Sequence, residues 1–88
     1  MAFIDKSSSF NAVTGEGYKV DTTSGNITAT LPAANTIISP ITFVNNAGAN
    51  SIIIAGTING QANYNVAAAK TIIIASDGAY IYIAGGNG

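Results

Sequence analysis

The side chains able to do acid–base or nucleophilic chemistry in this chain are few and scattered. Its acids are Asp5, Glu16, Asp21 and Asp77, and the sequence contains neither His nor Cys. Two carboxylates held about 5–10 Å apart can cleave a glycosidic bond, but all four acids fall in expected turns or near the N-terminus. Without His or Cys, the usual zinc, copper and haem ligand sets are missing. We therefore expect no metal and no cofactor.

The serines offer no stronger route to catalysis. A serine nucleophile needs a neighbouring base, and in the absence of His the only conceivable arrangement is a Ser–Lys pair using Lys19 or Lys70. No Gly-rich phosphate loop precedes a helix. We therefore expect a protein that is not an enzyme.

Size and composition favour assembly instead. The chain has 88 residues, enough for one domain, and 8% of them are charged against about 25% in ordinary domains. A core this small is marginal alone, and without Cys no disulfide can support it. These features predict a homotrimer that spends its life in a larger particle.

The composition also argues against nucleic-acid and membrane partners. The net charge is −1 and there is no Arg, so the basic surface that binds nucleic acid is missing. No apolar run approaches the roughly 20 residues of a membrane-spanning helix. The first six residues lack a basic start followed by an apolar stretch, so no signal peptide is expected.

The elements that must position any site are β-strands. In the stretch 71–83, β-branched runs flank Asp77-Gly78, a strong hairpin signal. Ile52–Ile54 and Ile72–Ile74 are apolar on both faces of a strand, so both runs are expected to be buried throughout. They match at a spacing of twenty residues, which would fit a β-solenoid, although no other strand joins the repeat.

The remaining strands are short and are separated by frequent turns, including Asn59-Gly60. This pattern favours a small all-β fold, an antiparallel β-sandwich or a barrel-like module. We predict three segments: an extended N-terminal arm at 1–16, the β module at 17–84 and a flexible tail at 85–88.

Two groups of side chains are candidates for contacts with partners. Phe3, Ile4 and Phe10 are large apolar residues in a polar segment, and the first hypothesis is that they dock the arm on a partner; the alternative is a frayed terminus. The second group is expected at a subunit interface or in the core and consists of Ile53, Ile73, Tyr80 and Tyr82. Aromatic faces such as those of Tyr80 and Tyr82 also stack on sugars.

The stretch 18–32, which begins Tyr-Lys-Val-Asp and ends Thr-Leu-Pro, resembles a motif of small β domains in bacteriophage virion proteins. Ile41–Val44, Thr57–Gly60 and Thr71–Ile83 follow in the same order. The resemblance implies a homotrimeric all-β module of the tail-fibre or capsid decoration (cement) type, with no catalytic residues to carry over.

This resemblance leaves two functions open. The first is a decoration protein that binds major capsid subunits on the outer surface of the virion and stabilises the shell. It is favoured because the module nearly fills the chain, whereas fibre domains belong to longer polypeptides. The alternative is a tail-associated module that binds host-surface glycans or adapts other tail proteins. Either would be made in the host cytoplasm.

Overall fold

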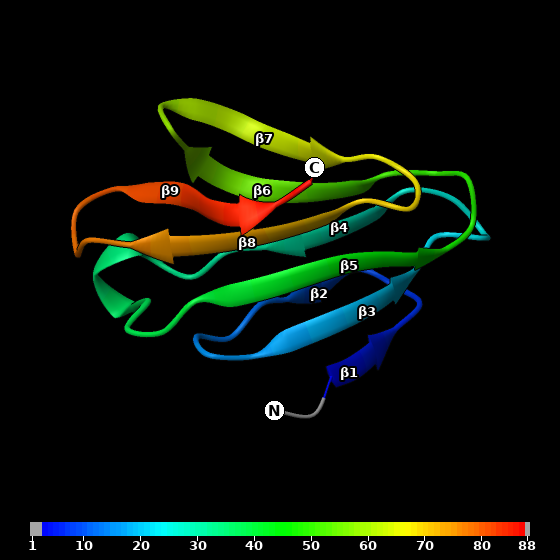
Figure 1. Ribbon diagram of the computed structural model, residues 1–88, viewed down its shortest axis with the longest axis horizontal. Helices are drawn as coiled ribbons and strands as arrows, with labels where there is room; N and C mark the ends of the chain where they lie inside the picture. Colours follow the sequence, from blue (N-terminus) through cyan, green and yellow to red (C-terminus); the bar gives the residue numbers. More distant parts are fainter. Residues whose placement is uncertain (1–2, 88) are drawn as a thin grey trace.

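A computed structural model describes residues 3–87. Within this range the chain forms one sheet of nine strands and a single 3₁₀ turn, η1. The strands are β1 (Phe3–Lys6), β2 (Phe10–Asn11), β3 (Gly17–Asp21), β4 (Ile27–Thr30), β5 (Ile41–Ala47), β6 (Ile52–Ile58), β7 (Gln61–Val66), β8 (Thr71–Ser76) and β9 (Ile81–Gly86), and η1 is Ala34–Thr36. The sheet curls into a nearly closed barrel, which confirms the all-β, barrel-like prediction (Figure 1).

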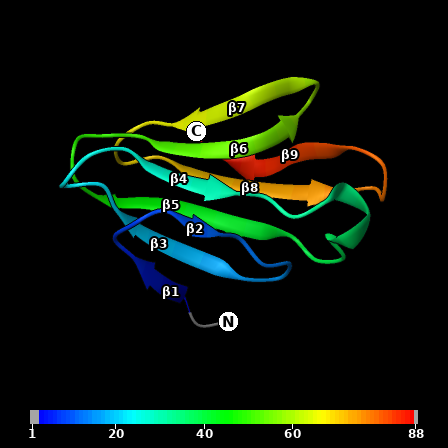
Figure 2. The ribbon, with the colours of Figure 1, turned by 180° about the vertical axis from the view of Figure 1, so that it is seen from behind.

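The first two thirds of the chain wind back and forth between two walls of this barrel. One wall contains β1, β3 and β5 side by side, and the other contains β2, β4 and β6 (Figures 1 and 2). Neighbours within each wall run parallel. Gly17 pairs with Thr42 and Ile27 pairs with Ile52, so the second and third windings are 25 residues apart on both walls.

The last third joins the two walls. β8 pairs antiparallel with β5 and with β9, β9 touches β6 at Ile58 and Ile81, and β7 folds back antiparallel on β6. The sheet is therefore mixed, and the expectation of antiparallel pairing was wrong for the four pairs formed among the first six strands, which are all parallel. The repeated triple-Ile runs do not stack on each other, because β9 lies between β8 and β6.

The core is filled by alternate residues of the strands, since successive side chains of a strand point to opposite faces. Ile72 and Ile74 on β8 are completely buried, as are Ile52 and Ile54 on β6. The central residue of each run, Ile73 or Ile53, faces outward and is only half-buried.

Residues 3–6 and 10–12, which belong to the expected N-terminal arm, are paired with the sheet of their own chain. β1 pairs with β3, β2 pairs with β4, and the N–H of Ala12 donates to the carbonyl of Thr30. The Phe10 ring lies 4.7 Å from the ring of Tyr18, centroid to centroid, and packs against the core. Backbone pairing and aromatic packing within the same chain thus hold the segment in place.

The C-terminal residues are also paired, so the expectation of a flexible tail differs from the structure. Gly85 and Gly86 belong to β9, and the Asn87 side chain and N–H both bond the backbone of Thr71. Gly86 has a positive φ and leaves no room for a Cβ, which would come within 2.3 Å of the Thr71 carbonyl oxygen. Gly88 and residues 1–2, parts of the expected tail and arm, lie outside the described residues.

At the end of the barrel where β3 and β5 finish, a buried polar cluster replaces apolar packing. The Asn45 side-chain amide donates to the carbonyls of Asn50 and Val66, and the Asn50 amide donates to the carbonyl of Thr22. The Thr22 hydroxyl lies within 3.0 Å of Asn45 Oδ1. Backbone carbonyls that leave the sheet here are therefore satisfied without water.

Candidate functional site

Most strands of the barrel carry no charged side chain. Among the described residues none occurs on the six strands from β4 to β9. The charged residues lie on β1 and β3 or in turns, and are Asp5, Lys6, Glu16, Lys19, Asp21, Lys70 and Asp77. A large, continuous part of the barrel surface is therefore uncharged, which is unusual for a protein that stays alone in water.

Ile73 lies on this surface, on β8. It is paired with Thr42 on β5 and with Gly85 on β9, and its side chain covers Gly85, where an added Cβ would lie 3.5 Å from Ile73 Cδ1. Tyr82, 43% exposed, is on the neighbouring strand β9. The prediction that Ile73 belongs to the core is therefore wrong for the single chain, while a role at a subunit interface stays a prediction.

Ile53 occupies a comparable place elsewhere on the barrel. It lies on β6 between Thr28 of β4 and Asn65 of β7, and it is half-buried as well. The core prediction for Ile53 fails for the same reason, because small polar neighbours cover only part of an outward-facing side chain. The structure does not bring Ile53 and Ile73 together.

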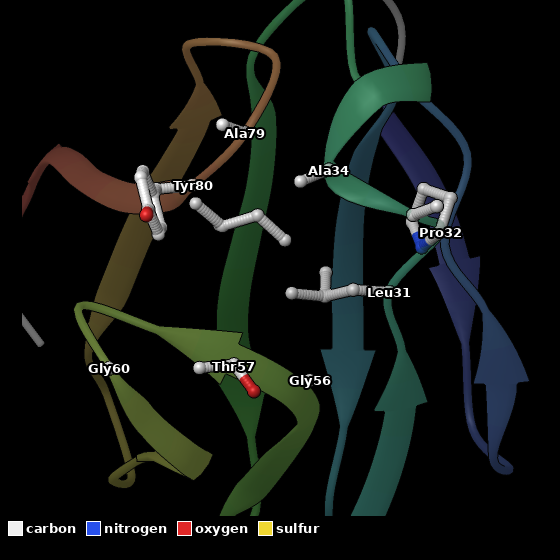
Figure 3. Close-up of a pocket in the computed structure, with 10 residues that line it drawn as sticks. Leu31, Pro32, Ala34, Gly56, Thr57, Gly60, Ala79 and Tyr80 are labelled. Carbon is white, nitrogen blue, oxygen red and sulfur yellow. The ribbon is translucent and has the colours of Figure 1, made fainter.

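A cleft of about 450 Å³ opens at the end of the barrel where β4, β6 and β8 finish. Tyr80 and Leu31 lie on opposite sides of it, with Thr57 and Gly56 between them (Figure 3). The remaining lining residues are Pro32, Ala33, Ala34, Gly60, Ala79 and Ile81. Apart from the hydroxyls of Thr57 and Tyr80, no side chain in the lining can form a hydrogen bond, so the cleft suits an apolar occupant.

Asp77 holds the turn that presents Tyr80 to the cleft. Its carboxylate accepts hydrogen bonds from the N–H groups of Ala79 (2.9 Å) and Tyr80 (2.8 Å). These bonds favour the ionised form and lower the pKa of Asp77 below its ordinary value. The predicted hairpin is present, with a four-residue connection in which Gly78 alone has a positive φ. Tyr80 is 75% exposed.

A second exposed apolar side chain, Ile38, stands at the same end of the barrel and was missed by sequence reasoning. It is 85% exposed, in the connection between η1 and β5. The Thr14 hydroxyl accepts hydrogen bonds from the N–H groups of Ile38 and Ser39, and Gly15 N–H donates to Ser39 O. The connection is therefore anchored, and Ile38 is held in water by a fixed backbone.

The predicted docking residues do not form one site. Phe10 is half-buried and packs against the core, whereas Phe3 and Ile4 on β1 are 41% and 38% exposed. Phe3 covers Gly17, where a Cβ would meet its ring at 3.1 Å. β1 is an edge strand of the sheet and contributes no residue to the cleft.

The acids are spread around the barrel. Asp5 and Asp21 line a small polar recess together with Lys19, and hydrogen bonds from Thr23 lower the pKa of Asp21. Asp77 lies in the β8–β9 connection. Within residues 3–87 there is no group of three acids that could hold a metal ion.

Comparison with protein-family models, curated proteins and solved structures finds no match for this chain. The part of the chain that the structure describes also contains no helix long and apolar enough to cross a membrane.

Proposed function

We propose that this chain is a non-enzymatic virion structural protein. Its copies form a homotrimer that binds major capsid subunits on the outer surface of a bacteriophage and stabilises the shell. The observation that supports this proposal is the uncharged surface of β4–β9, with Ile73 and Tyr82 on it. Such a surface favours burial against other subunits, since contact regions are depleted in charge and enriched in Tyr.

The location of the charges fits the same proposal. Asp5, Lys19 and Asp21 gather at the β1–β3 side, which leaves this side as the solvated or salt-sensitive part of the assembled protein. The apolar part then carries the lasting contacts, and salt does not weaken these, because screening weakens only electrostatic attraction.

The experiment compares the effect of one added negative charge on the uncharged surface with the effect of the same charge on the β1–β3 side. Full-length protein carrying Ile73→Glu is mixed with purified shells that lack the protein, and bound copies are counted after sedimentation, with Ser7→Glu as the matched control. We expect Ile73→Glu to lose trimers and shell binding while its circular dichroism stays unchanged, and Ser7→Glu to bind normally. Equal binding by both variants would refute the assignment of the uncharged surface to assembly.

Tyr80 favours a second candidate, a tail-associated module that binds host-surface glycans. An exposed tyrosine ring beside a cleft is a platform on which a sugar can stack. The cleft supplies few polar groups to orient a sugar, which makes this the weaker candidate. Glycan-array binding that is lost in Tyr80→Ala but kept in Tyr82→Ala would favour it, as would a copy number of tens per virion instead of hundreds.

A further inference from the structure

The end of the barrel combines an exposed apolar side chain, here called the knob, with an apolar cleft. The knob is Ile38, and the cleft is the one between Leu31 and Tyr80. In Figure 1 the η1–β5 connection, which carries Ile38, lies at the same end as the β8–β9 connection, which carries Tyr80. Because Ile38 is 85% exposed, it does not fill the cleft of its own chain.

We propose that Ile38 of one copy inserts into the Leu31–Tyr80 cleft of a second copy. This inference rests on the proposed homotrimer and specifies the contact that would build it. The two surfaces are different patches of one molecule, so the contact is heterologous and closes only as a ring. Three such contacts, each turning the next copy by the same angle, form a closed trimer.

The knob is prepared for insertion by its backbone. The Thr14 hydroxyl accepts hydrogen bonds from two N–H groups of the η1–β5 connection, at 2.9 and 3.0 Å. It also donates to the carbonyl oxygen of Ser39 at 3.2 Å. A connection that is already ordered loses little conformational freedom when it binds, which favours affinity. An isolated apolar side chain needs no explanation by itself, but one held rigidly beside a matching cleft does.

The cleft is prepared as well. Ile81, 7% exposed, forms its floor, and the two hydrogen bonds of Asp77 fix the turn that carries Tyr80. A volume of about 450 Å³ accommodates an aliphatic side chain together with part of the backbone beside it. Tyr80 would then cover the inserted Ile38, as aromatic residues do at the centres of interfaces.

The available area suits a second copy. A stable interface needs about 800 Å² from each partner, which is roughly a sixth of the 4582 Å² surface of this chain. One inserted side chain supplies only part of that area, and the uncharged surface of β4–β9, which reaches the cleft through β6 and β9, can supply the rest. The partner in this inference is another copy of the chain, because every copy carries both the exposed Ile38 and the apolar cleft.

Salt gives the contact a recognisable signature. Glu16 lies next to the anchored connection of the knob, and Asp77 lies in the turn beside the cleft, so both sides of the contact bear a negative charge. Like charges repel less when salt screens them. Association should therefore strengthen between about 0.02 and 0.5 M salt, whereas a contact between opposite charges would weaken.

The absence of Cys from the sequence allows a direct test by crosslinking. The double variant Ile38→Cys with Ala79→Cys places one thiol on the knob and one on the rim of the cleft. After mild oxidation, non-reducing gels should show covalent trimers for the double variant, while each single variant, which has one thiol per chain, should stay monomeric. Dimers formed by Ile38→Cys alone would mean that knob meets knob, and this would overturn the inference.

Light scattering separates failure of the contact from failure of the trimer. We expect Ile38→Asp and Ala79→Trp, which remove the knob and fill the cleft, each to weaken self-association about tenfold or more, while Ile4→Ser on the edge strand β1 leaves it unchanged. A mixture of the two weakened variants should form a one-to-one heterodimer, because one intact knob and one intact cleft remain. Unchanged trimers in both variants would overturn the contact alone, and a native chain that is monomeric at all concentrations would overturn the trimer with it.

Discussion

The alternation of buried and outward-facing residues within Ile72–Ile74 makes a sharp prediction about stability. Ile74 is completely buried between Ile41 of β5 and Ile83 of β9. Ile74→Ala removes three carbons, each worth about 0.8 kcal/mol when buried. The residual cavity adds a further term, so the expected loss in the free energy of unfolding is about 3–4 kcal/mol.

The neighbouring residue should respond differently. Ile73 points outward, is half-buried, and leaves no cavity when it is shortened. Ile73→Ala should therefore cost only about 1 kcal/mol in the isolated chain. If Ile73 is covered by another copy in the assembled protein, its cost should rise with protein concentration, because association adds to the apparent stability of the folded state.

Urea unfolding monitored by circular dichroism at several protein concentrations measures both quantities. The two substitutions lie at adjacent positions and remove the same three carbons, so each variant is the control for the other. Equal losses for Ile73→Ala and Ile74→Ala in dilute solution would refute the alternating burial. Such a result would mean that the run is covered on both faces even in the single chain.

Three further predictions follow from particular contacts. Gly48→Ala should be strongly destabilising, because a Cβ would lie 2.4 Å from the backbone of the β3–β4 turn, whereas Gly60→Ala, also at positive φ but in open space, should cost about 1 kcal/mol. Phe10→Ala should lower stability by about 2 kcal/mol, since its half-buried ring packs on Tyr18 and against the core. Asp77 has a folded pKa below its ordinary 3.8, so its contribution to stability is present above pH 3.8 and is lost as the pH falls towards the folded value.

Each of these expectations has a measurement that can contradict it. Chemical unfolding of the two glycine variants should give a clear difference, and equal losses would remove the steric explanation. An unchanged unfolding midpoint for Phe10→Ala would instead favour an N-terminal arm that does not pack on its own chain. Melting temperatures between pH 2 and 5 should fall less steeply for Asp77→Asn than for the native chain, because Asn keeps the acceptor and loses the titration; identical slopes would exclude a role for Asp77.

The sequence was sufficient for the features that depend on neighbouring residues. Period-two alternation and β-branched runs indicated strands, and Asn59-Gly60 indicated a tight turn. Both residues have the positive φ of a two-residue hairpin, 52° and 80°. The hairpin around Asp77-Gly78 and the all-β, barrel-like class were predicted for the same reason. Turn chemistry and side-chain alternation act within a few residues, so a short window of sequence contains them.

Tertiary structure alone decided which strands pair and which apolar residues remain outside. No pattern within the stretch 3–16 predicts that it pairs in parallel with β3 and β4. Parallel strands are not joined by a short turn, so the sequence between them contains no hairpin signal. The same applies to Ile53 and Ile73, whose neighbours across the sheet determine how much of them is covered. The cleft beside Tyr80 is assembled from the chain that follows β4, the end of β6 with its turn to β7, and the β8–β9 connection with the start of β9, so its shape exists only once the barrel has closed.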